Sequence, residues 1–158
     1  MRWVTRNNPH VDRCASLWLI KTFIDREAVF EFISRETAIP HGAIPLTLPG
    51  AEIQPKNGRT TFDALVDKYH ITDPIVLEIQ KIIRDAEAAE ETGEYELPES
   101  AGVFAVLRGL DRISKSDWEI IGKALIVMDS LYAELKNRPK QRATSDYFWY
   151  VWTAVQVI

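Results

Sequence analysis

The stretch "RWVTRNNPHVDRCASLWLI", residues 2–20, decides the architecture of this sequence. Its first five residues combine bulky and β-branched side chains, which predicts a short strand over residues 2–6. Asn8 and Pro9 then suit a helix N-cap followed by proline at the first helical position. Beyond them apolar residues recur at helical spacing, and the breadth of their stripe predicts a helix at the centre of the molecule.

The next segments of the chain add two more short strands. "AVFEFI", residues 28–33, is rich in β-branched and aromatic side chains and predicts a strand beside the first. Residues 38–59 contain so many prolines and glycines that we expect a long irregular segment, with a brief strand near residues 44–48. Irregular segments of this length inside a domain are often functional.

Helix signals fill the rest of the sequence. Thr60 and Asp63 have the spacing of a capping box, the pair Asp73-Pro74 marks another helix start, and Ser116 with Glu119 marks a third. Together with the first helix and one after the acidic stretch near residues 87–99, they predict about five helices. The expected fold is therefore mainly α, of the α+β kind, built around the N-terminal helix with a few short strands.

Length and composition describe one globular domain. The chain has 158 residues, 46% of them hydrophobic and 27% charged. We expect the domain to cover residues 1–138, and the basic and aromatic segment 139–158 to pack on it or on a partner chain.

The formal net charge of -4 argues against nucleic acid as a partner. No signal-peptide pattern is present and the apolar terminus is too short to span a bilayer, so we expect a cytoplasmic protein without membrane contact.

Cys14 is the single cysteine, which excludes an intrachain disulfide and a cysteine-rich metal site. His10, His41 and His70 lie apart without ligand spacing, and the sequence has no nucleotide-binding or hydrolase motif, so we expect neither a metal nor a cofactor. A nucleophilic Cys14 would need the help of Arg13 or His10 to lower its pKa. The favoured alternative is that Cys14 is a small apolar residue of the helix's core face.

The arginines at the start of the first helix form the stronger candidate site. Arg6 and Arg13 flank a helix N-terminus, where free N–H groups already attract anions. An ordinary surface network between Asp12 and the arginines is one interpretation, and a bound tetrahedral oxyanion is the other. These residues alone leave the two alternatives about even.

The opening stretch resembles the chromate-resistance family, the domain found at the C-terminus of ChrB proteins. The resemblance rests on "WVTR", on Pro9, on "VDRC" and on "WLI" and "FID", and continues through "PGAEI", "TFDALVDKY", "RGL" and "DSLYA". It covers about residues 2–135 in order. The sequence departs from the family at Pro55 and Thr60, where a His and a Cys would be expected. We therefore expect a divergent, stand-alone member.

The resemblance implies a role in chromate resistance, and chromate is a dianion that arginines and a helix N-terminus suit. We accordingly predict a small-oxyanion site, with chromate or sulfate as the kind of ligand, whose residues are Arg6, Asp12, Arg13, Lys21 and Arg59. In it Asp12 would position the arginines, and the 38–59 segment would close over them.

Two other functions remain open from the sequence. One is a redox enzyme that uses Cys14, with His10 or Glu52 as proton carrier, although the residues lean towards a protein that is not an enzyme. The other is a regulatory module in which the basic and aromatic C-terminal segment binds DNA or a partner chain, for example as a homodimer. The oxyanion site is the interpretation we favour.

Overall fold

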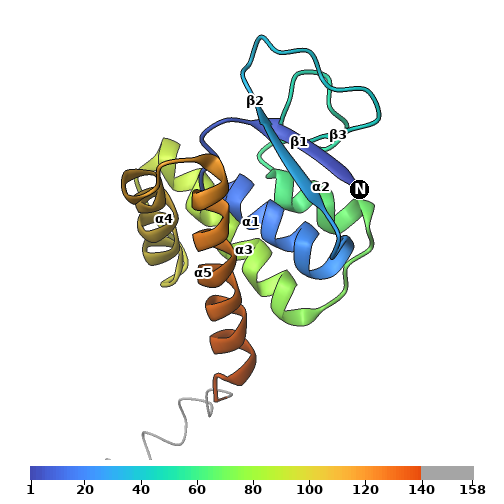
Figure 1. The fold of residues 1–158 in the computed structure, drawn as a ribbon. Coiled ribbons are helices and arrows are strands. Elements are labelled where there is room, and N and C mark those ends of the chain that lie inside the picture. The colour runs from blue at the N-terminus through green and yellow to red at the C-terminus, as the bar shows by residue number, and fades with distance from the viewer. Residues whose placement is uncertain (140–158) are drawn as a thin grey trace, which may run out of the picture.

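The computed structural model describes residues 1–139. Three parallel strands form one small sheet in the order β2-β1-β3, with β1 spanning Arg2–Arg6, β2 Val29–Ile33 and β3 Ile44–Pro45. Figure 1 shows these strands at one end of the molecule, with the helices packed below them. The three expected strands are confirmed, although β3 is only two residues long. Beyond it the Leu46 N–H still donates to the Val4 carbonyl at 2.8 Å, but Leu46 also forms an isolated bridge with Ile53, and Thr47 turns with a φ of 54°.

Residues 1–139 also form five α-helices, the first of them between β1 and β2, which confirms the expected mainly α, α+β fold. They are α1 Val11–Leu19, α2 Thr61–Lys68, α3 Pro74–Thr92, α4 Ser100–Gly109 and α5 Asp117–Asn137. A π-helical turn, Ile20–Ile24, continues α1, and a 3-10 turn, Leu110–Ile113, continues α4.

Local capping signals explain three of these helix starts. Thr60 and Asp63 form a complete capping box at α2, and the Asp73 side chain accepts from two N–H groups at the start of α3, where Pro74 is the first helical residue. At α5 the Ser116 side chain accepts from the Glu119 N–H. Each of these caps is local in sequence, which is why the sequence predicts these starts correctly.

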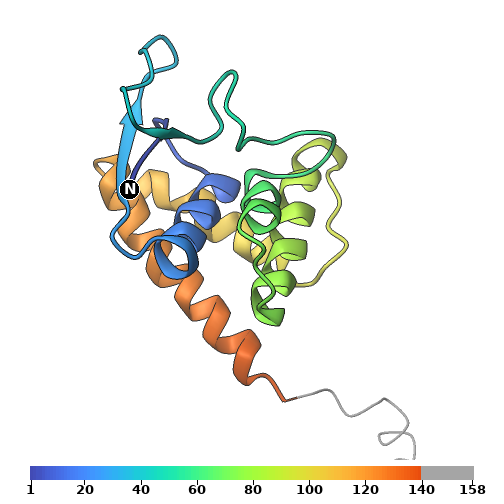
Figure 2. The same cartoon turned by 90° about the vertical axis from the view of Figure 1, so that its right-hand side faces the viewer.

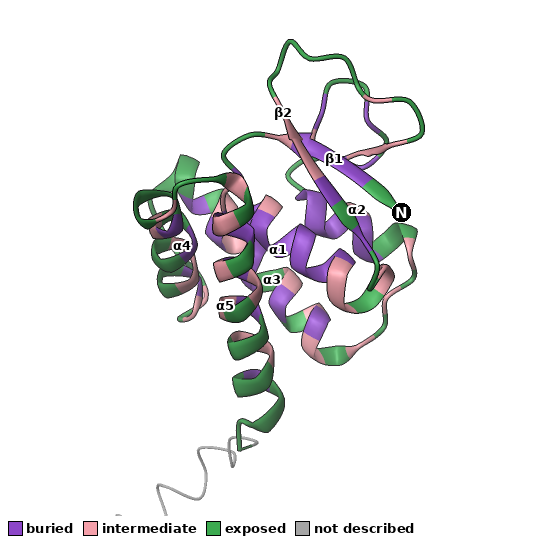
Figure 3. Cartoon of the chain, viewed as in Figure 1, coloured by how far each residue is buried: buried purple, intermediate pink, exposed green. Residues whose placement is uncertain are grey.

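Helix α1 lies at the centre of the fold and contacts α2, α3, α4 and α5. Figure 2 shows it between α2 and α3 on one side and α5 on the other. Eight of its nine residues are buried, and Trp18 and Leu19 have no exposed surface. Burial is concentrated on α1 and β1, as Figure 3 shows, whereas α4 and α5 carry much exposed surface. The broad apolar stripe of this helix is thus explained by neighbours on every side.

The long irregular segment covers the face of the sheet that the helices leave open. Trp3 belongs to the main core, whereas Val4, the next residue of β1, packs against Leu48 and Ala51 in a separate small cluster. Successive side chains of a strand point to opposite faces, so β1 is buried on both. Part of this segment therefore covers the second face of the sheet.

Two further observations complete the fold. Within residues 1–139, the helices lack the combination of length and apolar character that crossing a membrane would need. Apart from Pro139, the predicted C-terminal segment lies outside the described residues.

Candidate functional site

The connection from β1 to α1 lies at the carboxyl end of the central strand. Arg6 is the last residue of β1, and four residues separate it from Val11, the first residue of α1. In parallel sheets the carboxyl ends of the strands, together with the following helix N-termini, are where ligands usually bind. Three predicted site residues, Arg6, Asp12 and Arg13, lie at or beside this connection.

Arg13 binds the backbone of the connection between β1 and α1. Its guanidinium donates to the carbonyl of Arg6 at 2.6 Å and to that of Asn7 at 3.1 Å, and it also donates to the carbonyl of Asn8. Burial lowers the pKa of Arg13, and the nearby charge of Arg6 lowers it further. Three consecutive backbone carbonyls thus face one cation, which fixes the path of the chain between strand and helix.

The start of α1 differs from the one expected from sequence. Asn8 is not the N-cap, because it adopts a left-handed conformation with a φ of 53° and its N–H donates to Asp117 at 2.9 Å. The helix begins at Val11, and His10 occupies the N-cap position without a side-chain hydrogen bond. Asparagine tolerates the left-handed region, and the bonds from Arg13 hold the turn in this shape.

Asp12 does not hold the arginines, which corrects the predicted role. Its carboxylate accepts from the N–H groups of Thr61 and Phe62 at 2.8 and 2.9 Å, and from the Ser16 hydroxyl at 3.2 Å. Burial raises the pKa of Asp12, and the hydrogen bonds from Phe62 and Thr61 oppose that rise. The carboxylate is thereby directed to the first turn of α2, where free N–H groups stabilise an anion.

Glu87 occupies the N-terminus of α1 and was not predicted as a site residue. Its carboxylate, which comes from α3, accepts from the Asp12 N–H at 2.9 Å. Burial, and then the charge of Asp12, raise the pKa of Glu87 to about 7. In the sequence Glu87 is one carboxylate of an acidic run, and no local signal shows that a helix 75 residues earlier needs it.

Arg6 and His10 differ from their neighbours because each carries an unpartnered polar atom. The Nε of Arg6 and the Nδ1 of His10 are buried, and neither has a hydrogen-bond partner within residues 1–139. Burial lowers the pKa of His10, and the charges of Arg108 and Arg13 lower it further. Buried polar atoms without partners are uncommon in proteins and call for an explanation.

Cys14 lies in the core. Its side chain has no exposed surface, and its thiol donates to the Pro9 carbonyl at 3.4 Å. Burial raises the pKa of Cys14 to about 12, and the nearby Arg13 only partly offsets that rise. A thiol in this setting stays protonated and out of reach of a substrate, which fits the core interpretation of this residue.

The remaining predicted ligand-binding residues lie elsewhere. Lys21 lies in the turn beyond the C-terminal end of α1, and its ammonium donates to the Ala28 carbonyl at 3.1 Å. Arg59 precedes α2 and forms ion pairs with Asp67 at 2.9 Å and Asp63 at 3.9 Å. The structure therefore keeps Lys21 away from Arg6 and Arg13, which lie at the other end of the helix.

Arg59 instead borders a hollow of about 430 Å³ between the 55–60 loop and α3, which Asp12, Arg84 and Glu87 also line. Pro55 and Thr60, where the family resemblance implies His and Cys, line the same hollow. Throughout residues 1–139 there is no group of three or more His, Cys, Asp or Glu side chains that could hold a metal ion.

Arg84, which lines this hollow, forms an ion pair with the buried Asp63. Arg84 donates to both carboxylate oxygens of Asp63, from its Nε at 3.2 Å and from a terminal nitrogen. Burial alone would raise the pKa of Asp63, but the hydrogen bonds from Arg84 and Thr60 hold it below its ordinary value. One wall of the hollow is therefore fixed by a charge-assisted pair.

Comparison with known proteins identifies a family that matches most of the chain. The family described as "ChrB, C-terminal domain" matches residues 3–135. Protein ChrB of Cupriavidus metallidurans is 28% identical over 142 residues, a region that is 89% of this chain and 42% of that protein. The chain thus spans about two fifths of the length of this relative. No solved structure matches the chain.

Proposed function

The chain belongs to the family of the ChrB C-terminal domain, and from this premise we propose a chromate-resistance domain that binds or senses a small oxyanion. Arg6 carries the proposal. A guanidinium can only donate hydrogen bonds, yet the buried Nε of Arg6 has no partner within residues 1–139. An oxyanion beside Arg6 would satisfy that donor.

The position of Arg6 supports the proposal. It ends the middle strand of a parallel sheet, directly before the turn that leads into α1. His10, which has the second unpartnered buried nitrogen, follows in the same connection. A tetrahedral dianion accepts several hydrogen bonds at once, so one ligand can meet donors from both residues.

The charges around this connection also favour an anion. Burial lowers the pKa of Arg13 and that of His10, and nearby guanidinium groups lower both further, Arg6 acting on Arg13, and Arg108 and Arg13 acting on His10. The second effect reflects repulsion between like charges, and a bound dianion would relieve it. Arg108 is only loosely neutralised, because its ion pair with Glu90 is 3.5 Å long and exposed.

The proposal assigns roles that differ from those expected from the sequence. Arg13 shapes the connection through its three carbonyl contacts, so we regard it as a positioning residue. The first turn of α1 is already satisfied in part by Glu87. The ligand is therefore held by side chains, those of Arg6 and His10, rather than by the N–H groups of the helix.

The test is calorimetric titration of chromate and of sulfate into the 158-residue chain at low salt. Arg6→Ala should weaken binding about 10- to 100-fold, the effect of losing one charge-assisted hydrogen bond. Arg2→Ala is the matched control, because Arg2 lies at the opposite end of β1 and pairs with Glu31 at 2.6 Å. Equal losses in both variants would indicate a general charge effect, and a folded protein that binds neither anion would overturn the proposal.

A pH series with sulfate adds a second readout. His10 has a pKa below its ordinary value of 6.5, so it is neutral at pH 7 and becomes charged in more acidic solution. Sulfate stays a dianion in mildly acidic solution, so its binding should tighten once the pH falls below 6.5 and His10 becomes charged. In His10→Gln the tightening should disappear, and its persistence would remove His10 from the site.

A further inference from the structure

The hollow of about 430 Å³ between the 55–60 loop and α3 has walls of opposite charge. Its volume lies in the range of roughly 300–1,000 Å³ that is usual for small-molecule sites. Asp12 lines it too, but the carboxylate of Asp12 is already bound to the first turn of α2. The other charged residues that line the hollow are the cations Lys56, Arg59 and Arg84 and the carboxylates Glu87, Glu90 and Glu91 of α3.

A tight hairpin turn holds two of the cations together. Lys56 and Arg59 form an antiparallel bridge, in which each N–H donates to the carbonyl of the other, at 3.0 and 3.1 Å. Between them Asn57 and Gly58 have φ values of 54° and 72°, as the favoured two-residue hairpin turn requires. Residues directly opposite each other in such a pair carry their side chains on the same side. The turn therefore presents the charges of Lys56 and Arg59 side by side.

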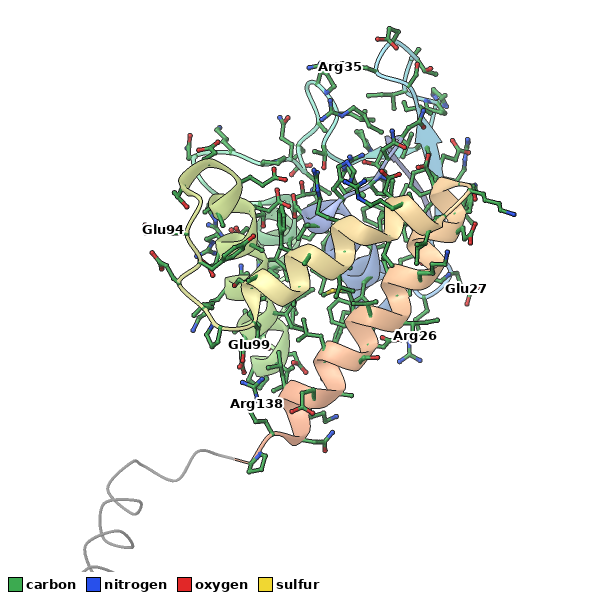
Figure 4. All side chains as sticks on the ribbon, turned by 90° about the vertical axis from the view of Figure 1, so that its left-hand side faces the viewer. Arg26, Glu27, Arg35, Glu94, Glu99 and Arg138 are labelled. Atoms are coloured by element: carbon green, nitrogen blue, oxygen red, sulfur yellow. The ribbon has the colours of Figure 1, made fainter. Side chains whose placement is uncertain are left out.

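The carboxylates of the other wall are neighbours on α3. Glu90 and Glu91 follow Glu87 at three and four residues, so the three side chains lie close together on the helix surface. Like charges at this spacing repel each other, and a cation between them would relieve that repulsion. Glu90 and Glu91 are exposed, and Figure 4 shows Glu94, two residues beyond α3, at the edge of the molecule. This end of the hollow is thus open to solvent.

The two walls do not neutralise each other. Lys56, Glu87 and Glu91 take part in none of the ion pairs formed within residues 1–139. Glu87 is held in place because one of its carboxylate oxygens accepts from the Asp12 N–H at 2.9 Å. Each wall therefore keeps charge that is available to a ligand.

We propose that this hollow binds a small zwitterion, a molecule that carries a carboxylate and an ammonium group as amino acids do. Lys56, supported by Arg59, takes the carboxylate, and Glu87 and Glu91 take the ammonium. Arg59 and Arg84 are already paired with aspartates, so the free positive charge of the first wall is mainly that of Lys56. One such charge suits a monoanionic carboxylate better than a dianionic phosphate. The proposal does not depend on the oxyanion site at Arg6.

The test is calorimetric titration of three amino acids of increasing length, glycine, 4-aminobutyrate and 6-aminohexanoate, into the 158-residue chain at low salt. The titrations are made at pH 8, where Glu87, with a pKa of about 7, is mostly charged. At least one of the three should bind with a Kd of about 1 mM or below. Butyrate lacks the ammonium and butylamine lacks the carboxylate, so each should bind at least about 10-fold more weakly, the effect of losing one charge-assisted contact.

Two exposed residues of the hollow provide the variants. Lys56→Gln and Glu91→Gln each remove the charge of one wall, and each should weaken binding of the best zwitterion about 10-fold. Lys115→Gln and Glu78→Gln are the matched controls, because both residues are exposed and neither lines the hollow. Both controls should bind as the wild type does. Circular dichroism confirms that each variant is folded.

Three outcomes would overturn the proposal. A folded protein that binds none of the three amino acids would show that the hollow is not a zwitterion site. Butyrate or butylamine binding as tightly as 4-aminobutyrate would mean that only one wall is used, and the site would then be one for a simple anion or a simple cation. Equal losses in the hollow variants and in their controls would show that net charge, rather than this site, governs the binding.

Discussion

Two regions of this molecule differ in which side chains they bury and which they expose. At the start of α1, Asp12, Arg13 and Glu87 lie in partly or fully buried positions, and each forms hydrogen bonds with backbone groups of the surrounding connections. On α5, by contrast, the apolar side chains of Trp118 and Ile126 are mostly exposed. Charge is concentrated inside the first region, and apolar surface is left outside in the second.

This difference shows that the type of a side chain is a poor guide to its task. A charged residue beside a helix start suggests a ligand site, yet Asp12 and Arg13 serve the backbone of their own chain. An apolar residue suggests the core, yet Ile126 faces water. The unsatisfied groups are more informative, and here they are the unpartnered polar atoms of Arg6 and His10.

The largest effect should come from Asp12. Asp12→Ala leaves the N–H groups of Thr61 and Phe62 without partners in a buried place, and each orphan donor is destabilising by about 1–3 kcal/mol. We expect a loss of about 4 kcal/mol in the free energy of unfolding, measured by urea denaturation. Glu36→Ala, an exposed substitution, should change it by less than about 0.5 kcal/mol. A loss below 1 kcal/mol in Asp12→Ala would contradict the capping role.

Glu87 should show the next largest effect, and one that depends on pH. Its pKa rises from 4.5 to about 7 on folding, so the folded protein holds this proton more tightly than the unfolded chain. The resulting stability is present below pH 4.5 and is lost as the pH rises through 7. Glu87→Gln keeps an acceptor for the Asp12 N–H and removes the charge. The variant should therefore be more stable than the wild type by about 2–3 kcal/mol at pH 8.

The same comparison at pH 4.5 is the control for Glu87. Both proteins then carry a neutral side chain at this position, so their unfolding free energies should agree within about 0.5 kcal/mol. A gain of the same size at both pH values would mean that packing, rather than ionisation, separates them.

Arg13 should have an intermediate effect on stability. Arg13→Met retains much of the apolar stem but removes all three contacts with the carbonyls of residues 6–8. Water can reach part of this connection, so we expect a loss of about 2 kcal/mol in thermal or urea unfolding. If Arg13 were instead a ligand-binding residue with no structural part, the variant would bind less oxyanion and unfold as the wild type does.

The smallest effect should come from the exposed side of α5. Ile126→Ser removes a side chain that is 67% exposed, and it should lower the unfolding free energy by less than about 1 kcal/mol. Ile121, on the same helix, is only 3% exposed, so Ile121→Ala should be destabilising by about 3 kcal/mol in the same assay. Similar losses at both positions would place Ile126 in a packed environment.

The sequence predicts the features of this fold that are local. The capping box of Thr60 with Asp63, the cap at Ser116 and the helix start at Asp73-Pro74 all depend on residues a few positions apart. The three strands were also found, because their composition is distinctive. The helix start at Asn8 was misplaced because a bond from Asp117, 109 residues away, and the contacts of Arg13 decide its conformation.

The candidate site was predicted less well, because its contacts are distant in sequence. Arg6 and Arg13 do lie together, as the sequence suggested, but Lys21 is at the other end of α1. Asp12 reaches α2 across 49 residues, and Glu87 reaches α1 across 75. Neither contact follows from helical or strand periodicity. No sequence motif indicates that a carboxylate will cap a helix that is distant in the chain.

These distant contacts have a consequence for how the chain is made. The connection between β1 and α1 is complete only when residues 61, 87 and 117 are all present, although it is synthesised before each of them. At the roughly 5–20 residues per second typical of synthesis, its last partner is made at least about five seconds later. During that interval Trp3, Trp18 and the rest of the first helix lack their native cover. Binding of a nascent-chain chaperone to this stretch would protect it from aggregation until Asp117 emerges.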